Sequence, residues 1–336
     1  RDLDVIMLDV EDDDADTIAA EVLAEQNPTK PEFDVVVRQG VRYAPRLMAM
    51  PLVAGGCVKM NMPSRGTFDI LHLQCFPPLV APEPGMVDIR VHAVGMNFRD
   101  VLNVMNMYPG DPGEPGSDFA GVVTATGDGV HSVRPTEAIY GFAWGAFRTH
   151  VRTFEQVIDA MPPGLNFAEA SCILTPTLTV ELALGPLADL KADEDLLIHA
   201  ATGGVGLSAI QFARRVGARI YATAGRPEKQ AYLRELGVTN IATSRDPELF
   251  KQGMREMLGD EGRVDVVLNS LADEYIPYSL ELLRQGGRFM EIGKRGIWTT
   301  EEMHAARSDV KYEAIALDHM VAALDPWIKQ GLAEVA

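Results

Sequence analysis

Hydrophobic and polar residues alternate in two different ways along this chain. Between residues 47 and 175, apolar side chains recur at every second position, as from Val87 to Ala93, where apolar residues alternate with Asp, Arg and His. This period of two is typical of half-buried antiparallel strands. Proline and glycine are frequent between these stretches, at 82–85, 109–116 and 162–164. We therefore predict a compact, mostly β unit.

From about residue 177, short apolar runs alternate with amphipathic segments. Strands are predicted at 195–199, 219–223, 240–243, 264–268, 287–292 and 312–317. Helices are predicted at 204–216, 227–236, 247–258, 273–284 and 319–330. Strands that alternate with helices in this way favour an α/β fold with a doubly wound parallel sheet of the Rossmann type.

The first 46 residues follow neither pattern. They predict a strand at 5–9, a helix at 15–26 and a strand pair at 34–38 and 41–43 around Gln39-Gly40. Ten acidic and two basic residues lie in the first 30, so this piece supplies −8 of the net charge of −18. We interpret it as a connector. The chain begins with Arg1, which predicts that it is part of a longer protein.

Composition excludes several classes of protein. A net charge of −18 argues against nucleic-acid and anionic-membrane partners. No apolar run approaches the roughly 20 residues of a membrane span, and no signal peptide is visible. Cys57, Cys75 and Cys172 are too few and too widely spaced for a disulfide framework, which favours a reducing, cytoplasmic location. The scattered histidines make a zinc site improbable.

A glycine-rich loop follows the first strand of the parallel sheet. It reads Ala201-Thr202-Gly203-Gly204-Val205-Gly206 and leads into a helix. Helix N-termini present unpaired N–H groups and a partial positive charge, so they favour a phosphate. Gly203 allows the backbone to approach a pyrophosphate, and Gly206 allows the helix to pack closely. The position between strand and helix favours dinucleotide binding over a purely structural turn.

The residues after the next strand indicate which dinucleotide binds. NAD-selective sites place an acid there, on the ribose hydroxyls. This chain has Ala224, followed by Arg226 and Lys229, whose charges suit a 2′-phosphate. Arg245 follows the next strand and is a further candidate. We predict NADPH; the alternative is that these are solvated bases at a helix start.

Three polar residues follow later strands of the sheet. Asn269, Lys294 and Asp318 should face one crevice, because ligands bind outside the carboxyl ends of parallel strands. A lysine beside a nicotinamide can donate a proton or stabilise an oxyanion, and Asp318 could orient it. A structural Lys–Asp ion pair is the equally simple alternative.

In the β-rich unit, the sequence from Asn97 to Gly110 stands out. Arg99 and Asp100 lie at the start of a short predicted helix, 99–106, which favours a structural role. Tyr108 precedes Pro109-Gly110 at a turn, where its phenol is either a general acid or a packed aromatic group.

Four motifs together resemble the enoyl reductase domains of modular polyketide synthases and animal-type fatty acid synthases. These are Asn97-Phe-Arg-Asp-Val-Leu-Asn-Val-Met-Asn-Met-Tyr-Pro-Gly110, His199-Ala-Ala-Thr-Gly-Gly-Val-Gly206, Val267-Leu-Asn-Ser-Leu271 and Glu291-Ile-Gly-Lys294. The likeness covers roughly residues 41–330. It implies a zinc-free medium-chain dehydrogenase/reductase with a β-rich GroES-like substrate domain beside the Rossmann domain.

The resemblance implies a reaction and a set of roles. NADPH reduces a trans-2-enoyl thioester carried on an acyl carrier protein, with hydride to the β-carbon and a proton to the α-carbon. Lys294 and Asp318 fall on the family's proposed proton-donor pair, and Tyr108 falls on its variable Tyr/Val position, linked to α-methyl stereochemistry. Asn97 and Asn269 join the glycine loop as expected cofactor contacts. The partners implied are the carrier protein and other domains of the same synthase, in a monomer or homodimer.

The resemblance also divides the chain. Residues 1–46 resemble a connector from the structural region of a preceding ketoreductase. Residues 47–176 form the substrate domain, 177–318 the NADPH-binding domain, and 319–336 an incomplete return to the substrate domain. Three alternatives stay open: a relative that forms a cyclopropane, a free-standing quinone or alkenal reductase, and a non-catalytic NADPH-binding scaffold.

Overall fold

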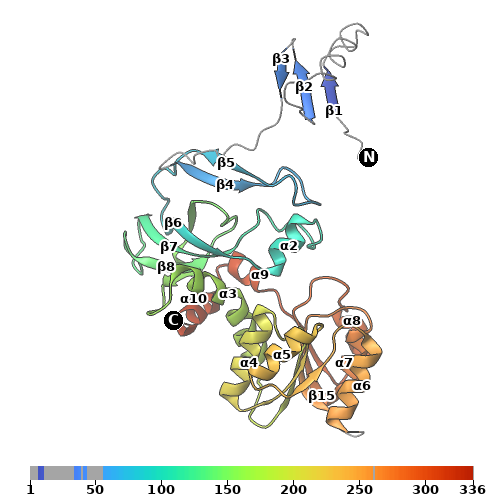
Figure 1. Ribbon diagram of the computed structural model, residues 1–336. Helices are drawn as coiled ribbons and strands as arrows, with labels where there is room; N and C mark the ends of the chain where they lie inside the picture. Colours follow the sequence, from blue (N-terminus) through green and yellow to red (C-terminus); the bar gives the residue numbers. More distant parts are fainter. Residues whose placement is uncertain (1–6, 11–33, 39–40, 44–55, 260–261, 336) are drawn as a thin grey trace. The chain divides into compact units, whose positions relative to one another are not determined.

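The computed structural model describes residues 7–10, 34–38, 41–43, 56–259 and 262–335 (Figure 1). The chain divides into two compact units, Arg1–Gly55 and Gly56–Ala336. The predicted domain boundaries at residues 46, 176 and 318 stay predictions.

The first unit contains a three-stranded sheet. Strand β1 (Met7–Val10) pairs in parallel with β2 (Asp34–Arg38), which pairs antiparallel with β3 (Val41–Tyr43). The predicted strand pair is confirmed, and β1 covers the part of the predicted strand at 5–9 that lies in the described residues. The helix predicted at 15–26 lies outside the described residues.

The second unit begins with antiparallel strands. Five of them form a sheet in the order β10-β8-β7-β6-β9, and β4 and β5 form a separate hairpin. The bounds are β4 (Cys57–Asn61), β5 (His72–Phe76), β6 (Met86–Gly95), β7 (Asp118–Thr126), β8 (Ala138–Phe142), β9 (His150–Phe154) and β10 (Ile158–Ala160). Val87 and Ile89 on β6 pack with Phe119 and Ile139 in one buried cluster, as the alternating pattern predicts.

The chain then forms a six-stranded parallel sheet in the order β13-β12-β11-β14-β15-β16. Its strands are β11 (Asp195–Ile198), β12 (Arg219–Thr223), β13 (Asn240–Ala242), β14 (Val264–Asn269), β15 (Leu283–Glu291) and β16 (Lys311–Ala314). Its helices are α4 (Gly204–Val216), α5 (Pro227–Glu235), α6 (Pro247–Leu258), α7 (Tyr275–Leu282) and α8 (Thr300–Ala306). The strand order reverses at β11, which opens a ligand-binding crevice at its carboxyl end. The Rossmann-type prediction is confirmed.

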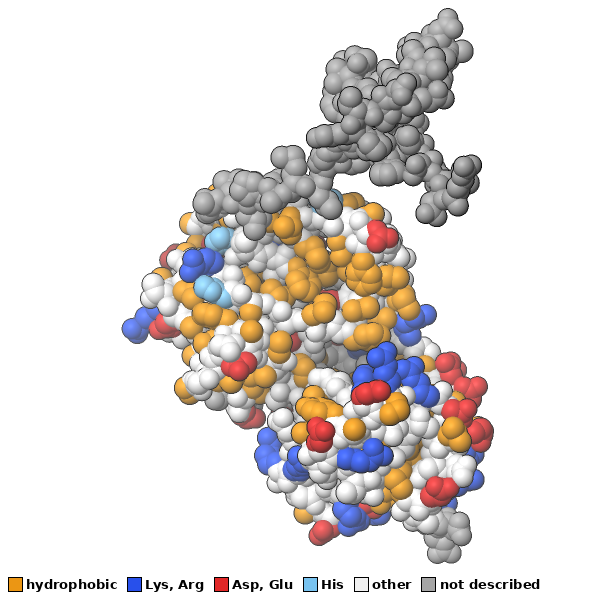
Figure 2. Space-filling model, viewed as in Figure 1, with side chains coloured by type: hydrophobic (Ala, Val, Ile, Leu, Met, Phe, Trp, Pro, Cys, Tyr) orange, Lys and Arg blue, Asp and Glu red, His pale blue; other side chains and the backbone are white. Residues whose placement is uncertain are grey.

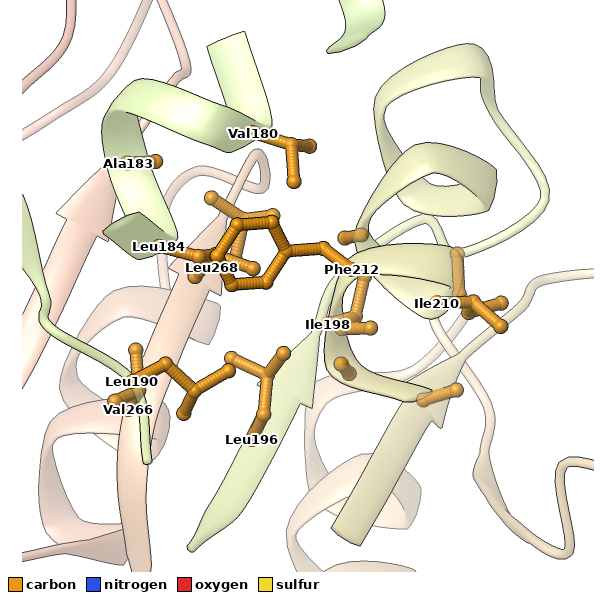
Figure 3. Packing of buried hydrophobic residues seen from close by; sticks show 14 of the residues in the cluster. Val180, Ala183, Leu184, Leu190, Leu196, Ile198, Ile210, Phe212, Val266 and Leu268 are labelled. Carbon is orange, nitrogen blue, oxygen red and sulfur yellow. The ribbon is translucent and has the colours of Figure 1, made fainter. Parts of the chain in front are cut away.

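Helix α3 (Phe167–Leu182) and the π turn η2 (Ala183–Leu187) join the two sheets. The early part of α3 packs with Tyr140 on β8, whereas its end enters the core beneath β11. Figure 3 shows the Phe212 ring pointing from α4 towards Leu184 and Leu268 in that core.

One helical stretch contradicts the expectation that no apolar run approaches the length of a membrane span. The helical stretch Phe167–Leu187 has 21 residues and is apolar enough to cross a membrane. Its packing into two hydrophobic clusters is what a core helix between two domains requires.

The single helix predicted at 319–330 is two helices. Helix α9 (Leu317–Ala322) ends before Leu324, whose φ of 53° is left-handed, and α10 (Pro326–Val335) begins at a proline. Proline suits the first helical position but cannot continue a helix from the preceding residues, so Asp325-Pro326 was the missed signal. Both helices pack back on the β-rich sheet, and the Tyr140 hydroxyl donates to the Leu332 carbonyl at 2.7 Å.

Candidate active site

The glycine-rich loop opens the crevice at the carboxyl end of β11. Gly203 is the N-cap of α4, so the first N–H groups of that helix face the crevice. A Cβ added to Gly206 would lie 2.5 Å from the Ala201 Cα, whereas a Cβ on Gly203 would meet only the Ala200 carbonyl oxygen, at 3.4 Å. The helix therefore packs tightly at Gly206 and leaves the Gly203 side open, the arrangement that a pyrophosphate needs.

His199 anchors the base of this loop. Its ring is buried, with Nε2 2.8 Å from the Ser279 hydroxyl and Nδ1 3.2 Å from the Thr223 hydroxyl. Burial lowers the pKa of His199 to about 3, so the ring is neutral at physiological pH.

The unfolding free energy should therefore fall as the pH drops below 6.5. The native state resists a proton that the unfolded chain accepts, so the stabilisation is complete above the usual pKa of 6.5 and is lost down to about 3. Urea titrations at pH 7 and pH 5 measure the free energy of unfolding. Between these pH values, the free energy of unfolding of the wild type should fall by about 2 kcal/mol more than that of His199→Gln. His131→Gln, at an exposed position, should keep the wild-type dependence. An unchanged pH dependence in His199→Gln would contradict this account.

Basic residues gather where β12 and β13 end. The chain passes from Thr223 through buried Ala224 to Arg226, the N-cap of α5, and Lys229 is exposed in the next turn. Arg245 donates from Nε to the Gly225 carbonyl at 3.1 Å. In residues 56–259 and 262–335, neither Arg226 nor Lys229 forms an ion pair within the chain. Bases at a helix N-terminus oppose the helix dipole, so a bound anion would be favourable here.

The ends of β14 and β15 are joined through a buried carboxylate. Glu291 accepts hydrogen bonds from the Asn269 amide at 2.6 Å and from the Gly293 backbone N–H at 2.6 Å. Burial raises the pKa of Glu291 to about 7, against the opposing effects of these donors and of Lys294. Asn269 is fully buried and also donates to the Leu271 carbonyl, so its amide holds the turn that leads to Lys294.

Lys294 lies beside this turn and is half-buried. Its Nζ donates to the Ile315 carbonyl at 2.8 Å. Burial lowers the pKa of Lys294, and the charge of Arg99 lowers it further, while Asp318 and Glu291 oppose the shift. An ammonium group that gives up its proton more readily than free lysine is suited to proton transfer.

Asp318 lies close to Lys294, but not where the sequence predicted. Strand β16 ends at Ala314, and Asp318 belongs to the first turn of α9, so the predicted strand end at residue 317 is wrong. The apolar run from Ala314 to Leu317 resembled a strand, but it contains the end of β16, a short connection and the first residue of α9. The Asp318 carboxylate pairs with Arg99 at 3.6 Å, and it also interacts with Lys294 through its charge, so the choice between a catalytic and a structural Lys294–Asp318 pair stays a prediction.

Tyr108 completes the group. Its hydroxyl donates to Asp318 Oδ2 at 2.6 Å. Burial and this bond raise the pKa of Tyr108 to about 12. Burial alone would raise the pKa of Asp318, but Tyr108, Lys294 and Arg99 outweigh it and hold that pKa below its usual value. The β-rich unit and the parallel sheet thus contribute side chains to one polar cluster.

The short helix α2 (Phe98–Val104) supplies the residue that sequence reasoning missed. The structural prediction holds for Asp100, which accepts from the backbone N–H groups of Asn97 and Gly116 at 2.8 and 2.7 Å. The Arg99 side chain instead pairs with Asp318 in the polar cluster. In the sequence, only its position in the Asn97–Gly110 motif pointed to a role at the site. The Asn97 amide nitrogen is buried without a hydrogen-bond partner.

No group of three or more His, Cys, Asp or Glu side chains in the described residues is arranged to hold a metal ion. The polar cluster is built from a lysine, an arginine, a tyrosine and an aspartate, which is a poor ligand set for zinc.

Two family models match this chain. The model of the zinc-binding dehydrogenases matches residues 204–321, and that of the GroES-like domain of alcohol dehydrogenases matches residues 83–158. These matches fall on the parallel sheet and the β-rich sheet, respectively.

Several curated relatives are polyketide synthases. The chain is 43% identical over 243 residues to a pikromycin polyketide synthase component of Streptomyces venezuelae, covering 71% of this chain and 6% of that protein. It is 39% identical over 295 residues to a phenolphthiocerol synthesis polyketide synthase of Mycobacterium tuberculosis whose name includes the word inactive, covering 85% of this chain and 18% of that protein. The chain thus spans less than a fifth of these relatives.

Solved structures give the same assignment. The CurK enoyl reductase is 35% identical, with a TM-score of 0.77 and coverage of 83% of this chain and 86% of that chain. The CurF enoyl reductase cyclopropanase of the curacin A pathway is 31% identical, with a TM-score of 0.76 and the same coverage. The quinone oxidoreductase of Escherichia coli, solved with NADPH, shares the fold at 24% identity, a TM-score of 0.72 and coverage of 83% and 86%. A parallel sheet with a dinucleotide loop, a GroES-like sheet and this similarity together show that the chain belongs to the medium-chain dehydrogenase/reductase enoyl reductase domains of polyketide synthases.

Proposed function

We propose that this domain uses NADPH to reduce trans-2-enoyl thioesters, presented on an acyl carrier protein, to saturated acyl thioesters. The observation that carries the proposal is the half-buried Lys294 ammonium beside the Tyr108–Asp318 pair, at the sheet edge where the glycine loop opens. A charged proton donor at the dinucleotide-binding edge of the sheet suits a reaction in which negative charge develops on the substrate. The same donor can then supply a proton to that substrate.

The residues present fit a reduced nicotinamide dinucleotide. The open side of Gly203 and the start of α4 would receive the pyrophosphate, and Arg226, Lys229 and Arg245 would hold the 2′-phosphate. The Asn97 amide nitrogen is buried beside Asp118 and would be a donor at the nicotinamide end. When bound, the cofactor supplies the hydride that the β-carbon accepts.

The protein contributes positioning and a proton. As the thioester oxygen gains negative charge, the Lys294 ammonium stabilises it and then protonates the α-carbon. Asp318 raises the pKa of Lys294, which keeps more of it protonated, and Tyr108 donates to Asp318 and fixes its orientation. The net change adds one hydride and one proton across the double bond.

The surface around α2 supports an acyl substrate. Met96 and Phe98 are 72% and 74% exposed at the start of α2. Met107, next to Tyr108 in the chain, and Trp144, which contacts Arg99, are also exposed. Figure 2 shows hydrophobic side chains over this region, with Lys and Arg side chains beside the hollow below it. Such a surface suits an apolar acyl chain. The acyl carrier protein and other domains of the same synthase would deliver that chain, and we expect the synthase to be cytoplasmic.

Selectivity for NADPH is expected to depend on Lys229. Lys229→Glu replaces an attraction for the 2′-phosphate by a repulsion, so the KM for NADPH should rise about tenfold or more while that for NADH stays within about twofold. Steady-state kinetics with both cofactors test this, with exposed Arg134→Gln as the control. Equal KM values for NADPH in wild type and Lys229→Glu would remove this residue from the binding site.

A second candidate is cyclopropane formation, because the CurF cyclopropanase shares 31% identity with the chain. The decisive experiment supplies NADPH with crotonyl-pantetheine, with a γ-halogenated enoyl-pantetheine and with a free quinone, and determines product masses. We expect crotonyl thioester to gain two hydrogens and to react faster than the quinone. Ring closure with halide loss would support the cyclopropanase, and faster quinone reduction would support a quinone reductase. Binding of NADPH without any turnover would indicate a scaffold.

A further inference from the structure

Arg99 contacts two aromatic rings beside the proposed proton donors. Its guanidinium carbon lies 5.0 Å from the centroid of Tyr108 and 4.8 Å from that of Trp144. Nη2 donates to the Pro112 carbonyl at 3.0 Å, and Nε lies 3.6 Å from Asp318 Oδ2. The oxygen that Arg99 faces is therefore the one that accepts the Tyr108 hydroxyl.

The Arg99 head group has unused hydrogen-bonding capacity. Nε and Nη1 are buried and have no hydrogen-bond partner, although Arg99 and Asp318 side chains are only 17% and 14% exposed. Burying a guanidinium is costly unless a carboxylate balances its charge, and Asp318 is the carboxylate that pairs with Arg99. A shift of a few tenths of an ångström would bring Nε within hydrogen-bonding distance of Asp318.

We propose that Arg99 is a positioning residue of the reductase: in contact with the Tyr108 and Trp144 rings, it holds the Asp318 carboxylate, and through it the Tyr108 hydroxyl, in place beside Lys294. This inference rests on the proposed function. It assigns the β-rich unit a direct part in arranging the proton-transfer group, because Arg99 lies in α2 and Tyr108 follows that helix, whereas Lys294 follows β15 of the parallel sheet.

Removal of the Arg99 charge has a defined electrostatic consequence. The charged groups that act on Lys294 are Asp318, Arg99 and Glu291. Those that act on Asp318 are Lys294, Arg99 and His319, and the neutral Tyr108 hydroxyl acts on it through a hydrogen bond. Arg99 lowers the pKa of both Lys294 and Asp318. A neutral side chain at position 99 should therefore raise both pKa values, an effect that a merely structural role does not require.

The test compares Arg99→Gln, Arg99→Lys and the exposed control Arg134→Gln. Acetylation of Lys294 by acetic anhydride, followed by peptide mass spectrometry across a pH series, reports the pKa of that lysine without turnover. Rates with NADPH and crotonyl-pantetheine are measured in parallel, and melting temperatures check that each variant folds.

Arg99→Gln should raise the pKa of Lys294 and lower kcat by about 100-fold, with a smaller change in KM, because displaced catalytic groups cost about that much. Arg99→Lys should keep the labelling pKa of Lys294 near that of the wild type but lower kcat by about tenfold, since lysine cannot stack and fork as arginine does. Arg134→Gln should change neither.

An unchanged Lys294 labelling pKa in Arg99→Gln, or a kcat within about twofold of wild type, overturns the proposal. If Arg99→Gln does not fold, a wild-type kcat in Arg99→Lys overturns it. No turnover of the enoyl thioester by the wild type would instead contradict the proposed function, while the labelling comparison would still decide the role of Arg99.

Discussion

Lys294→Met should lower kcat for enoyl thioester reduction by about 100-fold or more while leaving the Kd for NADPH within about twofold of wild type. Methionine keeps most of the apolar stem but has no proton and no charge. The half-buried Lys294 ammonium donates a hydrogen bond to the Ile315 carbonyl and lies close to Asp318. The polar cluster, as described, contains no second lysine that could replace it. NADPH consumption with crotonyl-pantetheine gives kcat, and fluorescence titration gives Kd.

The pH dependence supplies a second readout of the same residue. Lys294 must be protonated to donate, so kcat should fall as the pH rises through its pKa, which burial places below the 10.5 of free lysine. Lys191→Met, at an exposed ion pair with Asp189, is the matched control and should retain the wild-type kcat. Full kcat in Lys294→Met would remove this lysine from the chemistry.

The parallel sheet was predictable because each strand and helix carries its own local signal. The apolar runs of β11 and β14 are buried throughout, and Gly217 ends α4 in the left-handed conformation that glycine favours. The glycine loop was predictable for the same reason, since Gly203 and Gly206 act within one turn of the backbone.

The polar cluster was only partly predictable. Lys294 follows its strand, so the rule that ligands bind at the carboxyl ends of parallel strands identified it. For Tyr108 the sequence left two roles equally open, a general acid and a packed aromatic group. The contact between Tyr108 and Asp318 joins residues 210 positions apart, and no local pattern encodes it. Arg99 was assigned a structural role because the start of α2 explains an acid there, whereas only the packed Tyr108 and Trp144 rings reveal what the guanidinium faces.

Gly206→Ala should destabilise the domain and weaken NADPH binding together. The new Cβ would lie 2.5 Å from the Ala201 Cα and 2.6 Å from its carbonyl oxygen, so α4 or the loop must move. Overpacking of this kind costs about 1–3 kcal/mol, and the displaced N–H groups should lower NADPH affinity by about tenfold or more. Thermal unfolding without cofactor and NADPH titration measure the two effects.

Gly203→Ala separates packing from ligand approach. Its Cβ would meet only the Ala200 carbonyl oxygen at 3.4 Å, so the melting temperature without cofactor should stay near that of the wild type. NADPH affinity should still fall, because the methyl group occupies the side that the pyrophosphate approaches. Wild-type stability and affinity in Gly206→Ala would contradict the tight packing of α4 against the loop.

The path of the two hydrogens tests the central claim most directly. Crotonyl-pantetheine is reduced once with NADPH carrying deuterium at both C4 positions in ordinary water, and once with unlabelled NADPH in D₂O, and NMR locates the deuterium. We expect the cofactor deuterium on the β-carbon and the solvent deuterium on the α-carbon of the saturated thioester. Cofactor deuterium on the α-carbon, or a product without it, would contradict hydride transfer to the β-carbon followed by protonation at the Lys294 cluster.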